Sequence, residues 1–414
     1  MDEVKLTPMM KQYQQAKAEI PADAILFFRL GDFYEMFFDD AKRASGILGL
    51  VYTSRGGVPM CGFPWHALDS HLPKLIEAGV KVAIAEQVED PRLAKGIVKR
   101  EITRIITPGT VTDNAVLTPG RNNFLVAICR RRDRYGVAGL DISTGEFKIT
   151  ELDSMAELET ELHRLNTREC IVPVSLPQQW QQEGHPPHTA EKILWTTLDD
   201  WIFTFENVEE LLKRQFQTAS LDGFGCRNLE LAVCAAGAVL YYATENLRSA
   251  AGHIRKLTVY HNTRFMELDF TTQRNLELVE PMMGRARENT LLHVLDETVT
   301  PMGSRLMREW ILRPLYVLDE IMERHDAIDA MRGDPLTMAE IREVIGGIRD
   351  LERIIARLNI GTANARDMLA LGRSLEIVPD LKNLLGNFDT PLLNAMSGRL
   401  CDIPELLERI RSAI

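Results

Sequence analysis

The stretch FRLGDFYEMFFDDAKRA, at residues 28–44, decides how the beginning of this chain folds. It continues the short apolar run AILFFRL at residues 24–30, which is typical of a buried β-strand. Gly31 then begins a turn. From Phe33 to Ile47 the apolar residues recur at helical spacing. The stretch therefore predicts a strand, a turn and a helix, in that order.

Two side chains at the predicted turn could read DNA. Phe33 and Glu35 lie two residues apart. An apolar side chain can enter a base step and kink the duplex, and a mismatched step resists this less because its stacking is already impaired. A carboxylate beside it can accept a hydrogen bond from a thymine N3–H that mispairing leaves free. By spacing alone, however, such a pair more commonly indicates a core aromatic and a helix-dipole partner.

A resemblance separates these alternatives. The quoted stretch closely resembles the F-x-E mismatch-binding segment of the bacterial MutS family. Other motifs resemble the same family in its order along the chain: PMCGFPWHA at residues 59–67, RIITPGT at 104–110, LDISTGEF at 140–147, and TPMGSRL at 300–306 followed by Trp310 and Pro314.

The resemblance implies roles for five residues. Phe33 is expected to be the stacking wedge and Glu35 its hydrogen-bonding companion. Leu30 stands where many relatives carry Met, another apolar residue near the kinked step. Arg55 and Arg104 are expected to contact DNA phosphates, with plain solvated surface as the alternative for each.

The patterns and the resemblance together predict a multidomain α/β plus α protein. Residues 1–115 are expected to form a mixed α/β mismatch-binding domain. Residues 116–257 are expected to form a ribonuclease H-like α/β connector domain. Residues 258–414 are expected to form a mostly α-helical core (lever) domain, truncated because the last residues still have a helical pattern.

Within the last two domains some segments are predicted individually. A Pro- and Gln-rich stretch at residues 176–188 is typical of an exposed loop. Helical periodicity is clearest over residues 318–331, 338–358 and 365–375.

Composition and charge narrow the classes of function. The 414 residues carry a net charge of −11, which argues against a broadly basic nucleic-acid coat. Residues 1–110 are balanced, with 14 Lys and Arg against 14 Asp and Glu, so DNA contacts are expected there. The absence of a long apolar run and of a basic, apolar start predicts no membrane span and a cytoplasmic, nucleoid-associated protein. The six cysteines and nine histidines show no metal-ligand spacing, and no metal site is expected.

The sequence contains no phosphate-binding G-x-x-x-x-G-K-[ST] string, so this chain is not expected to be an enzyme and is expected to bind no cofactor. The resemblance implies a longer parent that is an ATPase, with ATP and Mg²⁺ bound outside these residues. It also implies a homodimer of that parent, recruitment of a MutL-like protein through the connector, and duplex DNA with mismatches or small insertion/deletion loops as the ligand.

Two other functions are considered. One is a MutS-related protein-interaction module without mismatch preference, against which the presence of Phe33 and Glu35 speaks. The other is a ribonuclease H-like metal-dependent nuclease, because Asp141, followed closely by Glu146, resembles a first acidic strand. Two-metal chemistry needs several converging carboxylates, and the sequence shows no convincing partner on a neighbouring strand.

Overall fold

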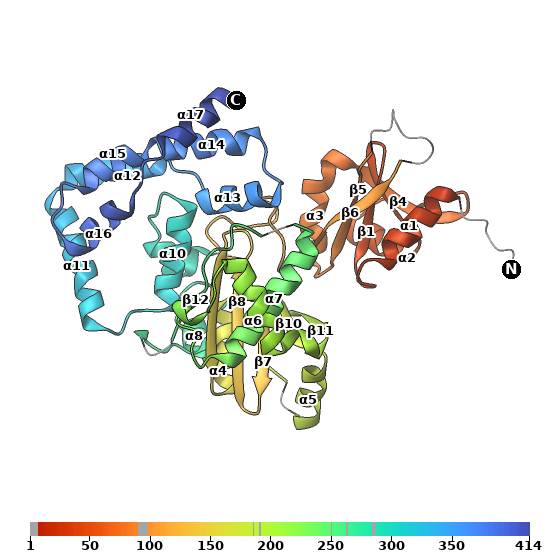
Figure 1. Cartoon of the computed structure of the whole chain (residues 1–414), viewed down its shortest axis with the longest axis horizontal. Coiled ribbons are helices and arrows are strands. Elements are labelled where there is room, and N and C mark those ends of the chain that lie inside the picture. The colour runs from red at the N-terminus through yellow and green to blue at the C-terminus, as the bar shows by residue number, and fades with distance from the viewer. Residues whose placement is uncertain are drawn as a thin grey trace.

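The chain passes through two β-sheets and then through a series of helices in the computed structural model (Figure 1). The structure describes residues 7–89, 98–184, 186–189, 192–249, 251–261, 264–283 and 287–414. In Figure 1 the first sheet and its helices form a lobe of their own, connected to the rest through the segment that follows β6. Two mixed α/β parts followed by a helical part confirm the predicted fold class.

The first sheet has six strands in the order β3-β4-β2-β1-β5-β6. β1 pairs antiparallel with β2 and parallel with β5, so the hairpin β1–β2 lies at the centre of the sheet. The strands are β1 (Ile25–Leu30), β2 (Phe33–Phe37), β3 (Thr53–Arg55), β4 (Val58–Pro64), β5 (Val82–Gln87) and β6 (Arg100–Ile106).

Helices cover both faces of this sheet. α2 (Phe38–Leu48) and α3 (Leu68–Glu77) share an apolar core with one face, and the short helix η1 (Trp65–Ala67) precedes α3. α1 (Pro8–Ala18) packs on the other face, where Tyr13 contacts Phe37 edge to face at 5.1 Å between ring centroids. We refer to these as the α2–α3 face and the α1 face.

The predicted helix beginning at Phe33 is wrong for its first five residues, which form β2. The apolar residues there suit either period, and pairing decides between them. Gly31 adopts φ 59°, which lets the chain turn back so that Phe33 pairs with Leu30. Helix α2 begins only at Phe38.

The second sheet has the order β11-β10-β7-β8-β9-β12. Strands β7, β8 and β9 form an antiparallel meander, while β10 is parallel to β7 and β11 is parallel to β10. The strands are β7 (Leu125–Arg131), β8 (Arg134–Asp141), β9 (Glu146–Leu152), β10 (Glu169–Pro173), β11 (Leu194–Leu198) and β12 (Thr258–Val259).

The helices of this part lie on both sides of its sheet. The mostly buried α7 lies so close to β8 that a Cβ on Gly136 would be 2.0 Å from the backbone of Leu231. The elements are α4 (Met155–Arg164), α5 (Ser175–Glu183), η2 (Asp200–Phe203), α6 (Phe205–Phe216), η3 (Asp222–Phe224) and α7 (Glu230–Leu247). No helix in the described part of the chain is both long and apolar enough to span a membrane.

The predicted exposed loop at residues 176–188 is wrong over its first half, which belongs to α5. Leu176 and Trp180 are buried at 2% and 4% exposure, and they lie four residues apart on one side of the helix. This apolar pair holds a Gln-rich segment against the sheet, although its composition is otherwise that of a loop.

The last part is helical. The single helix expected over residues 338–358 is wrong, because α12 ends at Gly346 and α13 begins at Leu351. A Cβ on Gly347 would lie 2.8 Å from Ile377 Cδ1, so the break brings the backbone against the residue that joins α14 to α15. The helices are α8 (Phe270–Asn275), η5 (Arg287–Asn289), α9 (Leu291–Leu295), α10 (Pro301–Leu312), α11 (Leu318–Gly333), α12 (Pro335–Gly346), α13 (Leu351–Ile360), α14 (Ala365–Glu376), α15 (Val378–Leu385), α16 (Pro391–Arg399) and α17 (Pro404–Ala413).

The segment between the two sheets is held by buried arginines of the helical part. Arg305 Nη1 donates to the carbonyl oxygen of Pro119 at 2.9 Å. Arg353 Nη2 donates to the carbonyl oxygens of Thr118 and Arg121 at 3.0 and 2.7 Å. Hydrogen bonds from charged donors are among the stronger ones, so this connection is fixed and not a free linker.

A buried carboxylate fixes the start of the same segment. Glu169, on β10, accepts hydrogen bonds from the hydroxyl of Thr107 and from the backbone N–H of Gly109 at 3.0 Å. It also accepts from Thr196 at 2.9 Å and from Tyr242 at 2.7 Å. The turn that ends the first sheet is therefore attached to the core of the second.

Candidate functional site

The tip of the β1–β2 hairpin presents an exposed aromatic side chain. Phe33 begins β2 directly opposite Leu30 and is 45% exposed. The backbone N–H of Trp65 donates to the carbonyl oxygen of Asp32 at 2.9 Å, which ties the turn to the end of β4. The backbone that carries Phe33 is therefore fixed on two sides, and its ring remains accessible.

Glu35 lies on the same face of the sheet as Phe33, because side chains two apart on a strand point the same way. Its partner across the strands is Gly62. A Cβ on Gly62 would lie 3.4 Å from Glu35 Cγ and 2.8 Å from the carbonyl oxygen of Tyr34. The missing side chain at Gly62 thus leaves room for the carboxylate of Glu35 beside the hairpin tip.

Arg55 contacts this carboxylate from the neighbouring β-hairpin. Its Nη1 lies 3.1 Å from Oε2 and 3.3 Å from Oε1 of Glu35. The Arg55 side chain is 59% exposed and that of Glu35 only 14%. An ion pair with one such exposed partner contributes roughly 0–1 kcal/mol, so it can open without endangering the fold.

Arg100 is a second cation near Glu35, and it was not among the site residues predicted from the sequence. Its guanidinium lies 5.2 Å from the ring centroid of Phe28, the residue that pairs with Glu35. It donates to Gln12 Oε1 at 3.0 Å. Burial lowers the pKa of Arg100, and the negative charge of Glu35 acts in the opposite direction. Strand pairing brings Arg100 here from a distant part of the sequence, which no spacing rule could reveal.

Leu30 is half-buried and packs at the edge of the apolar cluster on the α1 face. Its position opposite Phe33 places an apolar surface beside the exposed ring. The structure thus brings four of the five predicted site residues to one region: Leu30, Phe33, Glu35 and Arg55.

The fifth predicted residue, Arg104, lies elsewhere. It pairs across the strands with Ile84, which belongs to the core under α2 and α3, so Arg104 belongs to the α2–α3 face. Its guanidinium makes two hydrogen bonds of 3.2 Å to the carboxylate of Asp113. Arg104 is therefore on the opposite face of the sheet from Phe33 and Glu35.

A second exposed aromatic flanks the hairpin tip on the α2–α3 face. Trp65 is 47% exposed, and the guanidinium of Arg29 lies 4.7 Å from its ring centroid. Arg29 Nη1 is also 3.7 Å from Glu86 Oε2. Neither Trp65 nor Arg29 was singled out from the sequence, and both extend the accessible surface around the turn.

The acidic residue that suggested a nuclease is fully enclosed. Asp141 has 0% exposure and accepts hydrogen bonds from Asn122 Nδ2, the backbone N–H of Asn123, and the backbone N–H and hydroxyl of Ser143, at 2.7–3.2 Å. Among the residues that the structure describes, no group of three or more His, Cys, Asp or Glu is arranged to hold a metal ion. The Asp141 carboxylate has the environment of a structural anchor for the turn after β8.

Three family profiles match this chain in succession. "MutS domain I" matches residues 7–115, "MutS domain II" matches residues 123–255, and "MutS domain III" matches residues 271–414. The profile of domain I covers the sheet that carries Phe33 and Glu35.

Curated relatives align along nearly the whole chain. The protein is 40% identical over 418 residues to "DNA mismatch repair protein MutS" of Solibacter usitatus, covering 99% of this chain and 47% of the relative. The protein of the same name from Symbiobacterium thermophilum is 42% identical, with 100% and 48% covered. That of Methanosarcina barkeri is 39% identical, with 97% and 46% covered. The chain thus spans about half the length of the curated relatives it matches.

Proposed function

Because this chain belongs to the MutS family of DNA mismatch repair proteins and carries its domains I, II and III, we propose that its first domain recognises mismatched or unpaired bases in duplex DNA. The observation that carries the proposal is the exposed ring of Phe33 on a fixed hairpin tip, with the carboxylate of Glu35 on the same face. Phe33 is the wedge that enters a weakened base step. Glu35 accepts a hydrogen bond from the displaced base.

Discrimination between mismatched and intact DNA follows from the free energy needed to unstack a base step. Unstacking costs a few kcal/mol, and an impaired step costs less than an intact one. The negative charge of Glu35 repels phosphates, which penalises intact DNA that offers no hydrogen bond in return. Arg55 and Arg100 lie close enough to offset this charge where the backbone passes, and Leu30 supplies apolar surface beside the step.

The test is fluorescence anisotropy at low salt, on a duplex with one unpaired thymine and on its matched duplex. We expect the native chain to prefer the defect and Phe33→Ala to bind the two duplexes equally. Trp201→Ala is the control, because Trp201 is an aromatic of similar exposure, 54%, in the second sheet's part of the chain. A native chain that binds the two duplexes equally contradicts the assignment and favours the alternative of a protein-interaction module.

The proposal extends to a longer protein, because the curated relatives are about twice the length of this chain. We infer that it is an ATPase, that ATP and Mg²⁺ bind outside these 414 residues, and that it acts as a homodimer. We also propose that its connector, the part formed by the second sheet, recruits a MutL-like protein and that it works in the cytoplasm on nucleoid DNA. Pull-down of a MutL-like protein by the chain, with and without the connector's exposed Trp201 replaced, tests the recruitment.

A further inference from the structure

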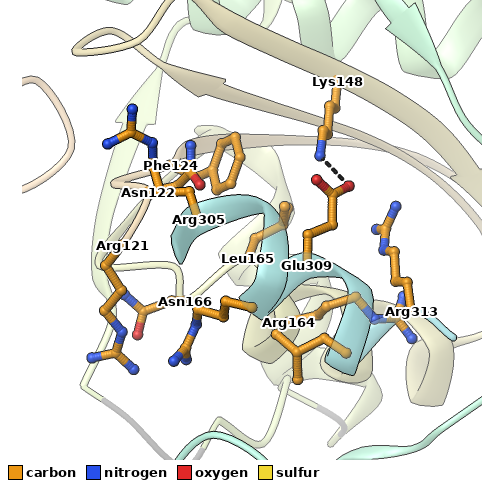
Figure 2. A pocket seen from close by; sticks show the side chains of 12 residues that line it. Arg121, Asn122, Phe124, Lys148, Arg164, Leu165, Asn166, Arg305, Glu309 and Arg313 are labelled. Carbon is orange, nitrogen blue, oxygen red and sulfur yellow. Dashed lines mark hydrogen bonds and ion pairs between the residues drawn. The ribbon is translucent and has the colours of Figure 1, made fainter. Parts of the chain in front are cut away.

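Ion pairs attach the meander of the second sheet to a helix at each of its ends. At one end, Lys148 on β9 lies 2.6 Å from Glu309 on α10, as Figure 2 shows. At the other end, Arg131, the last residue of β7, places its guanidinium nitrogens 2.6 and 3.1 Å from the two carboxylate oxygens of Glu230, the first residue of α7. This second ion pair sets which residues of β7 and α7 face one another.

Two cysteines occupy the next positions along this contact between strand and helix. Cys129 precedes Arg131 by two residues, and Cys234 follows Glu230 by four. These are the spacings at which side chains return to the same face of a strand and of a helix, and the two steps, about 6.6 and about 6 Å, are nearly equal. Both cysteines belong to the apolar core that α7 shares with the sheet, where they are 9% and 3% exposed. Cys129 therefore lies opposite Cys234.

A glycine lets the helix come close enough to the sheet for the two side chains to meet. Gly136 on β8 pairs with Cys129 across the strands, so both residues face the same side of the sheet. A Cβ on Gly136 would lie 2.0 Å from the backbone carbonyl carbon of Leu231, so the backbone of α7 touches the sheet directly beside Cys129. A disulfide requires such a close approach, because its two Cα atoms must lie within about 7 Å.

The two thiols also differ in acidity. Hydrogen bonding with Cys234 lowers the pKa of Cys129 below its ordinary value, and the charge of Arg131 acts in the same direction, while burial opposes both. The pKa of Cys234 is raised by its hydrogen bond with Cys129 and by burial. The thiolate is the form that attacks an oxidant, and Cys129 is also the more exposed of the two. Cys129 is therefore the residue that reacts first.

We propose that Cys129 and Cys234 are a redox-sensitive pair, which hydrogen peroxide converts to a disulfide between β7 and α7. The thiolate of Cys129 attacks one peroxide oxygen and the O–O bond breaks. The departing hydroxide combines with the proton that the thiol had lost, which leaves a sulfenic acid on Cys129. The sulfur of Cys234 then attacks that of Cys129, the S–O bond breaks, and the hydroxide takes the proton of the Cys234 thiol. Two thiols and one peroxide thus give one disulfide and two waters.

The disulfide closes a loop of roughly 100 residues, so it restricts the unfolded chain and stabilises the connector against unfolding. Oxidation thereby makes the connector more rigid without a change of its fold. This inference does not depend on mismatch recognition.

The test is peptide mapping of the folded chain after exposure to hydrogen peroxide. The reaction is stopped in acid with N-ethylmaleimide, and the exposed Cys401 is replaced by serine in every chain to prevent links between molecules. Trypsin places the two cysteines in separate peptides, residues 122–130 and 228–248, with one cysteine in each. We expect a linked pair that is two hydrogens lighter than the sum of these peptides and that dithiothreitol separates. The linked chain is expected to have a Tm higher by about 5 °C or more.

Three variants establish the order of the reaction. Cys234→Ala should leave Cys129 as a sulfenic acid that dimedone captures, whereas Cys129→Ala should leave Cys234 reduced. Cys226→Ala is the matched control, because Cys226 is 7% exposed in the same apolar core, and it should form the link as the native residues do. The linked peptide is read without these substitutions, so the test does not depend on the variants folding.

The proposal is overturned if both cysteines stay reduced, if Cys129 is oxidised further without a link to Cys234, or if either cysteine is found linked to a different one. A linked chain whose Tm does not exceed that of the reduced chain overturns the stabilising role.

Discussion

Arg55 and Glu35 form an ion pair, 3.1 Å from Nη1 to Oε2, on the face of the hairpin that presents Phe33. The guanidinium of Arg55 therefore contacts the same carboxylate that the proposed function assigns to a displaced base. Arg55 is the more exposed partner, so a DNA phosphate competes with Glu35 for it from the solvent side.

Replacing Arg55 tests whether it binds a DNA phosphate, in addition to its ion pair with Glu35. Arg55→Gln is expected to weaken binding to matched and mismatched duplexes alike and to reduce the slope of log affinity against log salt by about 1. The free energy of unfolding should change by less than about 0.5 kcal/mol, because the pair is exposed. Anisotropy over a salt series and urea denaturation measure these quantities. A loss confined to the mismatched duplex would instead assign Arg55 to the displaced base.

Gly62 is expected to be intolerant of any side chain. In Gly62→Ala the new Cβ meets the Tyr34 carbonyl oxygen at 2.8 Å, so strands β2 and β4 must separate. We expect a destabilisation of about 1–3 kcal/mol, measured by urea denaturation. The control is Gly46→Ala in α2, where nothing lies within 4 Å of the added Cβ and alanine should stabilise by about 0.5–1 kcal/mol. Equal effects at Gly62 and Gly46 would contradict this account.

His163 makes the stability depend on pH. Its pKa is lowered to about 4 by burial and then by three arginines, against about 6.5 in an unfolded chain. Between these values the unfolded chain binds more protons than the folded one, so the contribution of His163 to stability is complete above pH 6.5 and is lost as pH falls toward 4. We expect His163→Asn to flatten the decline of Tm over this range in phosphate-free buffer. An NMR titration that finds the imidazole of His163 titrating near pH 6.5 in the folded chain would refute this pH dependence.

Arg353 is expected to slow hydrogen exchange in the segment between the two sheets. Arg353→Gln removes the hydrogen bonds to the carbonyl oxygens of Thr118 and Arg121. Hydrogen–deuterium exchange over residues 112–123 should then be at least about tenfold faster, since each bond from a charged donor is worth roughly 1.5–3 kcal/mol. The exposed Arg349→Gln, on the turn before α13, is the control and should leave this segment unchanged. Faster exchange in both variants would indicate general destabilisation.

How far the sequence predicts the fold can be judged at particular residues. Long periodic segments were predicted correctly in kind, as at α11 and α14. The strand β2 was not, because the apolar residues from Phe33 to Phe37 suit both periods and only pairing with β1 and β4 selects the strand. Likewise the break between α12 and α13 depends on a contact of Gly347 with Ile377, thirty residues away.

In the candidate site, too, local features were predicted from the sequence and contacts between distant residues were not. Phe33 and Glu35 were found through a local motif, and the strand explains why residues two apart share a face, which a helix would not provide. The Arg55–Glu35 pair, the role of Gly62 and the approach of Arg100 all come from strand neighbours distant in sequence. Local spacing carries no information about such contacts. Arg104, the other predicted phosphate contact, lies on the opposite face of the sheet because it pairs across the strands with Ile84.

The hydrogen bonds from buried arginines to residues 114–121 restrain the movement of this segment. Besides the bonds from Arg305 and Arg353, Arg357 Nη1 donates to Asn114 Oδ1 at 3.0 Å. A connection without slack transmits a displacement of α13 to residues 114–121. Thr107 and Gly109, just before them, are bound to Glu169 of the second sheet, so the first lobe is braced by both later parts of the chain. Under the proposed function, the load of a duplex bent around Phe33 therefore passes to the second sheet and to α13, far from any base.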